Sequence, residues 1–250
     1  MAGVVGVIPA RFASTRFPGK PLVDLGGKPM IQRVWERARM AKSLDEVLVA
    51  TDDRRIASVA RAFGAEAVMT PASCASGTDR IARAVFRRGR RAPDLVVNIQ
   101  GDEPFLDPGA VDRLVGLLRK DARAAMATLA HPFGGAREWS NPNAVKVLVD
   151  AGGRALVFSR AGLPYPRGAQ DSWRNPRVGR HIGLYAYRTW FLRRFTALRP
   201  GLLEKAESLE QLRALENGYG ILVGWTGGST PAVDTPGDAA RARRLLGKSS

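Results

Sequence analysis

The 250-residue sequence contains a single cysteine, Cys74, and no apolar run long enough to cross a lipid bilayer. One cysteine excludes an internal disulfide framework and is typical of a reducing compartment. The first residues enter an apolar strand pattern directly, without the pattern of a cleavable signal. We therefore expect a cytoplasmic protein that does not insert into a membrane.

Acidic residues are also scarce beside basic ones. The 23 Asp and Glu stand against 39 Lys and Arg, which gives a formal net charge of +16. Such a charge attracts anions, so nucleic acid, an anionic membrane and a phosphorylated substrate all have to be considered. The only dense basic cluster lies at 87–91, between a predicted helix and a predicted strand. Because aromatic residues do not interleave it, a solvated loop is favoured over a nucleic-acid interface.

Linkers rich in proline or serine and internal repeats are missing too, so we expect one α/β domain and no independent domains. Strand patterns and amphipathic helix patterns alternate through the first half, which predicts a mostly parallel, doubly wound sheet. Pro9 has no N–H to donate and is expected to end the first strand. The expected strands of this half lie at about 4–8, 46–50, 65–69 and 95–99.

The second half of the sequence has a different pattern, which predicts a smaller region of mixed strands. The segment Asp150-Ala151-Gly152-Gly153 is typical of a hairpin turn. A leucine-rich pattern predicts one helix over about 204–216 that ends at Gly218. The expected strands of this half lie at about 124–130, 144–149, 155–158 and 182–187.

Four polar segments fall at the carboxyl ends of the expected strands of the first half. Ligands of parallel α/β sheets bind at the carboxyl ends of the strands, so these segments are expected to share one edge. The four segments are Arg11 to Lys20, Thr51-Asp52, Ser76-Gly77 and Gln100-Gly101-Asp102.

The first of these segments has the composition of a polyphosphate cradle. It holds Arg11, Arg16 and Lys20, and its Ser, Thr and Gly residues leave main-chain N–H groups for an anion. Pro21 follows Lys20, so the loop is not a Walker A motif. A basic surface loop is the alternative interpretation.

Asp102 follows the buried strand pattern at 95–99 and is a candidate Mg²⁺ ligand, because Mg²⁺ binds few protein oxygens and keeps water and phosphate ligands. A turn residue or a helix cap is the alternative for this aspartate. Near the C-terminus, Thr235 fits a helix N-cap with Pro236 at the first helical position and Asp238 completing a capping box. Capping accounts for Thr235 and Asp238 but gives no role to Asp234.

The string Pro-Ala-Arg-x-x-Ser-Thr-Arg-x-Pro-Gly-Lys-Pro-Leu at 9–22 resembles the nucleotide-binding loop of the CMP-Kdo synthetases, also called 3-deoxy-manno-octulosonate cytidylyltransferases. The strings Ser-Gly-Thr-Asp-Arg at 76–80, Asn-x-Gln-Gly-Asp-Glu-Pro at 98–104 and Val-Asp-Thr-Pro at 233–236 are similar to motifs of the same family. Further similarity covers 141–147, 158–160, 180–188 and 203–213.

The resemblance implies a fold like that of the nucleotide-diphospho-sugar transferases, and the transfer of CMP from CTP to the anomeric hydroxyl of 3-deoxy-D-manno-octulosonate (Kdo). It further implies Mg²⁺ as cofactor, a homodimer and a role in lipopolysaccharide biosynthesis. The nucleotide-binding half would cover about 1–122, and the sugar-binding and dimerisation region about 123–232. Residues 233–250 would form a metal-ligand turn and a helix.

The site residues that these motifs imply fall into three groups. Residues expected at the nucleotide are Ala10, Arg11, Arg16, Lys20, Thr51, Ser76, Gly77 and Gln100. Residues expected at the sugar acid are Arg80, Gln100, Arg160, His181, Tyr185, Glu210 and Gln211. Asp102 and Asp234 are the expected metal ligands, and with Arg11 and Lys20 they form the expected catalytic set.

The sequence departs from the family pattern at Cys74, where a histidine is usual, and at Gly237, where a glutamate is usual. Without the resemblance, His181 would be read as a surface histidine, Tyr185 as a core or interface aromatic residue, and Glu210 as a solvent-facing helix residue. The alternative substrates are a related acidic sugar, such as 8-amino-Kdo or a sialic acid. A nucleic-acid-binding protein is the alternative from another functional class.

Overall fold

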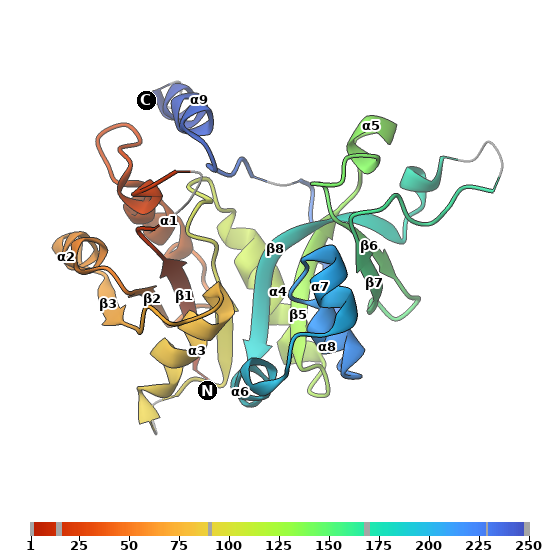
Figure 1. Cartoon of the computed structure of the whole chain (residues 1–250), viewed down its shortest axis with the longest axis horizontal. Coiled ribbons are helices and arrows are strands. Elements are labelled where there is room, and N and C mark those ends of the chain that lie inside the picture. The colour runs from red at the N-terminus through yellow and green to blue at the C-terminus, as the bar shows by residue number, and fades with distance from the viewer. Residues whose placement is uncertain (1–2, 14–16, 90–91, 168–170, 229, 248–250) are drawn as a thin grey trace. The chain divides into compact units, whose positions relative to one another are not determined.

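A computed structural model of the chain describes residues 3–13, 17–89, 92–167, 171–228 and 230–247. The chain forms two compact units (Figure 1). One comprises Met1–Asp112 with Thr230–Ser250, and the other Arg113–Ser229. No helix in the described part of the chain is long and apolar enough to cross a membrane.

The first unit contains four parallel strands in the order β3-β2-β1-β4. The core strands are apolar on both faces; every residue of β4 is buried, as in parallel sheets that helices cover on both sides. The predicted parallel α/β sheet is therefore confirmed. The strands are β1 (Val4–Ala10), β2 (Glu46–Thr51), β3 (Glu66–Met69) and β4 (Leu95–Asn98).

The helices of this unit alternate with its strands, as the sequence pattern predicts. Their buried sides carry the apolar residues spaced by one helical turn, for example Met30, Ile31 and Val34. The helices are α1 (Met30–Ala38), α2 (Arg54–Ala62), α3 (Gly77–Phe86), the start of α4 (Pro108–Lys120) and α9 (Pro236–Gly247), with a 3₁₀ turn at Lys20–Leu22.

The expectation that Pro9 ends the first strand is wrong, because β1 continues to Ala10. The carbonyl of Val7 accepts the N–H of Ile99 on the side of β4. Main-chain groups alternate sides along a strand, so those of Pro9, two residues on, face the same side. The pairing with β4 has already stopped at Val7, and the missing N–H of Pro9 therefore interrupts no ladder.

The second unit has mixed strand directions, as predicted. Strand β8 pairs antiparallel with β5 and with β6, β6 pairs antiparallel with β7, and β5 pairs parallel with β9. The elements are β5 (Met126–His131), α5 (Ala136–Trp139), β6 (Lys146–Val149), β7 (Ala155–Ser159), β8 (Val178–Arg188), α6 (Thr189–Ala197), α7 (Leu202–Glu207), α8 (Leu212–Glu216) and β9 (Ile221–Trp225).

The predicted hairpin turn between β6 and β7 is present. The carboxylate of Asp150 accepts the main-chain N–H groups of Gly152 and Arg154, both at 2.8 Å. Gly153 adopts a φ of 79°, which glycine reaches without steric strain. An aspartate that bonds its own turn and a glycine at positive φ explain why this segment reverses the chain.

The prediction of one helix over 204–216 is wrong, since α7 and α8 are separate short helices. Ser208, between them, has φ 51° and ψ 48°, a left-handed conformation that ends α7. The leucines of the predicted pattern, Leu209, Leu212 and Leu215, all come after Ser208. Glu207, the last residue of α7, bonds Ser159 and Arg160, as described below.

Candidate functional site

The carboxyl end of β1 leads into the predicted cradle. Ala10 is buried at the end of the strand, and the guanidinium of Arg11 donates a hydrogen bond to the carbonyl of Cys74. Arg11 thereby joins the cradle to the segment that precedes Ser76. The third predicted cation of the cradle, Arg16, lies outside the described residues.

Phe12 and Gly19 join the two ends of the cradle loop. Gly19 donates its N–H to the carbonyl of Phe12 at 2.9 Å, and it has a φ of 71°. A Cβ at this position would lie 3.2 Å from the ring of Phe12, so the glycine backbone packs directly on that ring. On the same ring lies the guanidinium of Arg55, 3.4 Å from the centroid. Asp53, the N-cap of α2, holds Arg55 with two side-chain hydrogen bonds of 3.0 and 2.6 Å.

Lys20 follows Gly19 and lies between the two predicted metal ligands. Its Nζ is 2.8 Å from Oδ2 of Asp102 and 3.1 Å from Oδ1 of Asp234. Burial alone would lower the pKa of Lys20, but the two carboxylates outweigh burial and raise that pKa above its usual value. The N–H of Val233 donates to the carbonyl of Asp102 at 2.9 Å, which keeps the two aspartate segments side by side.

This arrangement fits a Mg²⁺ ion. The carboxylates of Asp102 and Asp234 both bond the same ammonium group, so they are close enough to share one cation. The described residues contain no cluster of three or more metal-binding His, Cys, Asp or Glu side chains. Two carboxylates are nevertheless enough for Mg²⁺, because it completes its coordination with water and substrate phosphates.

Helix α9 begins just after Asp234, and the predicted capping box is present. The Asp238 carboxylate accepts the main-chain N–H of Thr235 at 3.0 Å, and the Thr235 hydroxyl accepts the N–H of Asp238 at 3.2 Å. Capping therefore uses Thr235 and Asp238 while the Asp234 side chain lies against Lys20.

Glu103 is a functional candidate that our reading of the sequence missed. Burial and the neighbouring charge of Asp102 raise the pKa of Glu103 to about 7. Its position directly after a predicted metal ligand was the available signal. This carboxyl group is therefore able to change its charge near neutral pH, next to the predicted metal ligand.

The remaining predicted nucleotide residues lie at the end of β2, after β4 and at the start of α3. Thr51 is fully buried at the end of β2, and Gln100 follows β4. Gly101 packs on the end of β1, since a Cβ there would lie 3.0 Å from the carbonyl of Pro9. Ser76 caps α3 in a capping box with Asp79, and Gly77 is the first residue of that helix.

Arg80 is fully buried inside this unit. Its guanidinium donates to Asp52 at 2.7 Å and to the hydroxyl of Thr70 at 2.5 Å. The structure shows Arg80 in an ion pair with Asp52. Its contact with the sugar stays a prediction. Asp52 belongs to the predicted polar segment Thr51-Asp52, but it is not among the predicted site residues.

Five of the predicted sugar residues belong to the second unit, and two of them lie together on β8. The rings of His181 and Tyr185 are 5.4 Å apart, and Phe158 packs edge-on against His181 at 4.9 Å. The hydroxyl of Thr128 lies within hydrogen-bond distance of the carbonyls of Leu184 at 2.9 Å and Ile182 at 3.1 Å, and it forms a hydrogen bond with Nε2 of His181 at 3.0 Å.

The electrostatics of this cluster keep both rings uncharged. Burial lowers the pKa of His181 to about 3. Burial, together with the charges of Tyr187 and Glu210, raises the pKa of Tyr185 well above its usual value. Gln211, which follows Glu210 in the chain, is buried.

Arg160 follows β7 and carries a positive charge that neutral groups hold in place. Its guanidinium donates to the carbonyls of Glu207 at 2.7 Å, Pro142 at 3.2 Å and Ser208 at 3.5 Å. Within the described part of the chain, its guanidinium hydrogen bonds all go to main-chain carbonyls. The carboxylate of Glu207 accepts the main-chain N–H of Arg160 and not its guanidinium, so the guanidinium keeps N–H groups that suit an anion.

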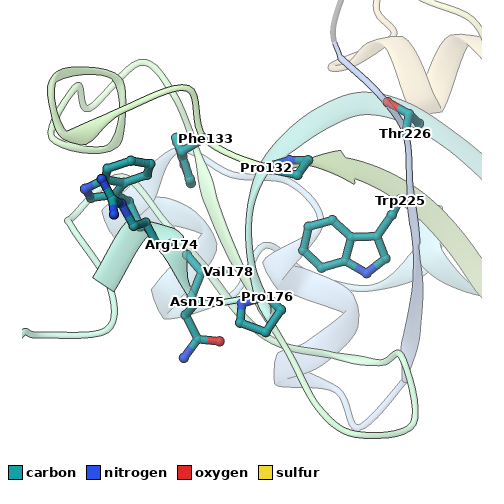
Figure 2. Close-up of a pocket in the computed structure, with 9 residues that line it drawn as sticks. Pro132, Phe133, Arg174, Asn175, Pro176, Val178, Trp225 and Thr226 are labelled. Carbon is teal, nitrogen blue, oxygen red and sulfur yellow. The ribbon is translucent and has the colours of Figure 1, made fainter. Parts of the chain in front are cut away.

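The second unit also contains a pocket of about 460 Å³ (Figure 2). Aromatic and proline side chains make most of its wall, and none of the predicted site residues lines it. The lining residues are Pro132, Phe133, Trp173, Arg174, Asn175, Pro176, Val178, Trp225 and Thr226.

Comparisons with known proteins agree with this geometry. A family model described as Cytidylyltransferase matches residues 5–221. The 3-deoxy-manno-octulosonate cytidylyltransferase of Syntrophobacter fumaroxidans is 52% identical over 236 residues, which cover 94% of this chain and 93% of that protein. The protein of the same name from Anaeromyxobacter dehalogenans (strain 2CP-C) is 50% identical over 246 residues, which cover 98% of both chains.

Solved structures show the same relationship. A CMP:2-keto-3-deoxy-manno-octonic acid synthetase complexed with CTP matches with a TM-score of 0.93 and 42% identity over 100% of both chains. The 4-diphosphocytidyl-2C-methyl-D-erythritol synthase of Anaerococcus prevotii shares the fold alone, with a TM-score of 0.62 and 14% identity over 98% of this chain and 99% of that one. The chain belongs to the cytidylyltransferase family and, within it, to the 3-deoxy-manno-octulosonate cytidylyltransferases.

Proposed function

We propose that this chain transfers CMP from CTP to the anomeric hydroxyl of Kdo and releases pyrophosphate. Relatives that carry this activity in their names match nearly the full chain at about half of its positions. The observation that carries the proposal is the position of Lys20 between Asp102 and Asp234, at the carboxyl ends of the parallel strands. At that edge a cation can neutralise phosphate charge and two carboxylates can hold Mg²⁺, and both effects favour nucleotidyl transfer.

In the transfer, the anomeric oxygen forms a bond to the α-phosphorus of CTP. The bond from that phosphorus to the bridging oxygen of the β-phosphate breaks, and the electron pair leaves with pyrophosphate. The proton of the anomeric hydroxyl passes to solvent. Arg11 and Lys20 neutralise the negative charge that grows on the phosphate oxygens, so the chain contributes mainly orientation and electrostatic stabilisation.

Asp102 and Asp234 would hold Mg²⁺, which when bound supplies positive charge to the triphosphate and lowers the pKa of a hydroxyl beside it. The proposed nucleotide contacts of this unit come from Ala10, Arg11, Arg16, Lys20, Thr51, Ser76, Gly77 and Gln100. Those that lie in the described ranges end a strand, follow a strand or lie at the start of a helix or 3₁₀ turn, and main-chain N–H groups at helix starts are available to phosphate.

We further propose that Arg160 binds the carboxylate of the sugar acid. Uncharged His181 and Tyr185 form hydrogen bonds with its hydroxyls. The imidazole offers Nδ1, because its Nε2 bonds Thr128, whereas the phenol both donates and accepts. Glu210 and Gln211 supply further polar contacts, as do Arg80 and Gln100. A carboxylated polyol is the substrate class that this combination recognises.

A homodimer, a cytoplasmic location and a role in lipopolysaccharide biosynthesis are part of the same proposal, and the family resemblance is their support. Light scattering coupled to size-exclusion chromatography tests the dimer. A monomer across the micromolar range would contradict it.

Pyrophosphate release with a panel of substrates tests the proposed activity. The panel combines CTP, UTP and ATP with Kdo, 8-amino-Kdo and a sialic acid, each with Mg²⁺ and with a chelator. We expect turnover with CTP and Kdo that stops when Mg²⁺ is removed. Preference for 8-amino-Kdo or a sialic acid would move the assignment to that sugar, and absence of release with every pair would refute the proposal.

A further inference from the structure

The loop that carries Arg160 is fastened to the end of α7 by Glu207. The carboxylate of Glu207 accepts the hydroxyl of Ser159 at 2.6 Å and the main-chain N–H of Arg160 at 2.9 Å. The carbonyl of Glu207 accepts Nε of Arg160 at 2.7 Å. One residue therefore fixes both the backbone and the side chain of the arginine.

Glu207 is an anion at neutral pH. Burial alone would raise the pKa of Glu207, but its hydrogen bonds and the positive charges of Arg160 and Lys146 outweigh burial and lower that pKa below its usual value. The charge of Glu207 thus has two cations beside it, one of which is the arginine that it positions.

The second cation, Lys146, fastens the same loop from the other side. Lys146 lies opposite Ser159 in the pairing of β6 with β7, and its side chain is fully buried. Its Nζ donates to the carbonyls of Arg160 and Asn141, both at 2.8 Å. A fully buried ammonium group is unfavourable unless its bonds compensate for lost hydration. These bonds give this lysine a role that an apolar residue at the same strand position would not have.

The turn that follows Glu207 carries two further residues of the proposed sugar site. Ser208 adopts φ 51°, and no other non-glycine residue in the described ranges has a positive φ. Its carbonyl is one of the acceptors of the Arg160 guanidinium. Glu210 and Gln211 lie two and three residues after Ser208, between α7 and α8, which lie together in Figure 1.

We propose that Glu207 and Lys146 are positioning residues, which hold the guanidinium of Arg160 in the orientation that binds the carboxylate of the substrate. The inference rests on the proposed function. Binding a carboxylate through two parallel hydrogen bonds needs a planar fork in a fixed direction. An arginine that has to be ordered on binding loses rotamer freedom, which weakens the affinity. Neither Glu207 nor Lys146 needs to touch the substrate for this effect.

Steady-state kinetics of Glu207→Gln and Lys146→Met test the inference. Glutamine keeps the size of Glu207 but removes its charge, and methionine keeps the length of Lys146 but removes its donors. We expect each change to raise the KM for Kdo about tenfold or more, as expected for a lost binding interaction, while the KM for CTP changes less than about twofold.

Glu216→Gln is the matched control. Glu216 also binds α7 through its carboxylate, but at the other end of the helix, where it accepts the N–H groups of Leu203 at 2.9 Å and Glu204 at 3.1 Å. If Glu207 acted only by stabilising α7, both variants would raise the KM for Kdo equally. We expect Glu216→Gln to lower the melting temperature without a change in that KM.

A double-mutant cycle with Arg160→Lys provides the second readout. The effects of Glu207→Gln and Arg160→Lys on the KM for Kdo are expected to be non-additive, because the first change acts through the second residue. Additive effects, or a Glu207→Gln enzyme with an unchanged KM for Kdo, would overturn the inference. The proposed function would still stand if the wild-type enzyme turned over CTP and Kdo. A wild-type enzyme without turnover would refute both.

Discussion

At the scale of single residues, Lys20 is the group whose loss should be most visible in catalysis. It lies on a loop, at the start of a short 3₁₀ turn, so the fold should survive its truncation. We expect Lys20→Ala to lose about 2–4 kcal/mol of transition-state stabilisation, the range for removal of one preorganised donor. The measurement is kcat/KM with CTP and Kdo, and near-normal turnover would remove Lys20 from the catalytic set.

The two aspartates beside Lys20 should act as one unit. We expect Asp102→Asn and Asp234→Asn each to lower kcat and to raise the Mg²⁺ concentration needed for half-maximal rate. The double variant should be little worse than either single variant, because residues that hold one ion lose most of their function with the first removal. Titration of the rate with Mg²⁺ for all three variants is the measurement.

Asp238→Asn is the control for this pair. It weakens the capping box of α9, which should lower stability by about 1 kcal/mol and leave the Mg²⁺ requirement unchanged. Losses that add up across the two aspartate variants, with an unaltered metal dependence, would argue against a shared ion.

At the scale of elements, the cradle depends on the contact of Gly19 with Phe12. Gly19→Ala would force a Cβ to 3.2 Å from the ring and strain a φ of 71°. We expect a loss of about 1–2 kcal/mol in the free energy of unfolding and a raised KM for CTP. Gly27→Ala is the matched control, because its φ is 79° but a Cβ there meets nothing within 4 Å.

Chemical denaturation and the KM for CTP distinguish the two glycine variants. Gly27→Ala should lower stability by about 1 kcal/mol through backbone strain and leave the KM for CTP unchanged. Equal changes in KM for both variants would show that the cradle does not depend on the packing of Gly19 on Phe12.

At the scale of the whole molecule, stability should depend on the burial of His181. Its pKa is about 3 in the folded chain and near 6.5 in the unfolded chain. Between these values the unfolded chain binds the proton, so the free energy of unfolding falls as the pH drops below about 6.5. The histidine contributes at most about 1.4 kcal/mol per pH unit to this decline.

Urea unfolding of the wild type and of His181→Gln at pH 7.5 and pH 5.5 measures this contribution. Glutamine does not titrate, so the unfolding free energy of the wild type should fall more between pH 7.5 and pH 5.5 than that of the variant. A difference that stays constant between the two pH values would mean that His181 has the same pKa in the folded and the unfolded chain.

The net charge of +16 belongs to the whole molecule as well. Part of the basic cluster is used internally, since Arg88 pairs with Glu46 at 2.6 Å. We therefore expect only weak binding to random duplex DNA at physiological salt. Tight binding at that salt, with affinity that falls steeply as salt rises, would favour the nucleic-acid alternative. Fluorescence anisotropy over a salt series is the measurement.

The sequence by itself predicted the parallel sheet, the hairpin at Asp150 and the cap at Thr235. These features follow from local patterns: the apolar period of strands and helices, a turn-forming aspartate with a glycine at positive φ, and a side chain that bonds the next turn of its own helix. The family motifs at 98–104 and 233–236 also predicted Asp102 and Asp234 as site residues, because each motif is a continuous stretch of sequence.

Only the tertiary structure decided which distant groups meet. Pro9 lies inside β1 because the pairing with β4 has already stopped at Val7. Ser208, whose carbonyl accepts a hydrogen bond from Arg160, has a left-handed conformation where the sequence pattern predicts a helix. The ammonium of Lys20 between two aspartates, and the burial of Arg80 against Asp52, likewise join segments far apart in the chain. Pattern and propensity report neighbours along the chain, whereas the charge, burial and orientation of a site depend on neighbours in space.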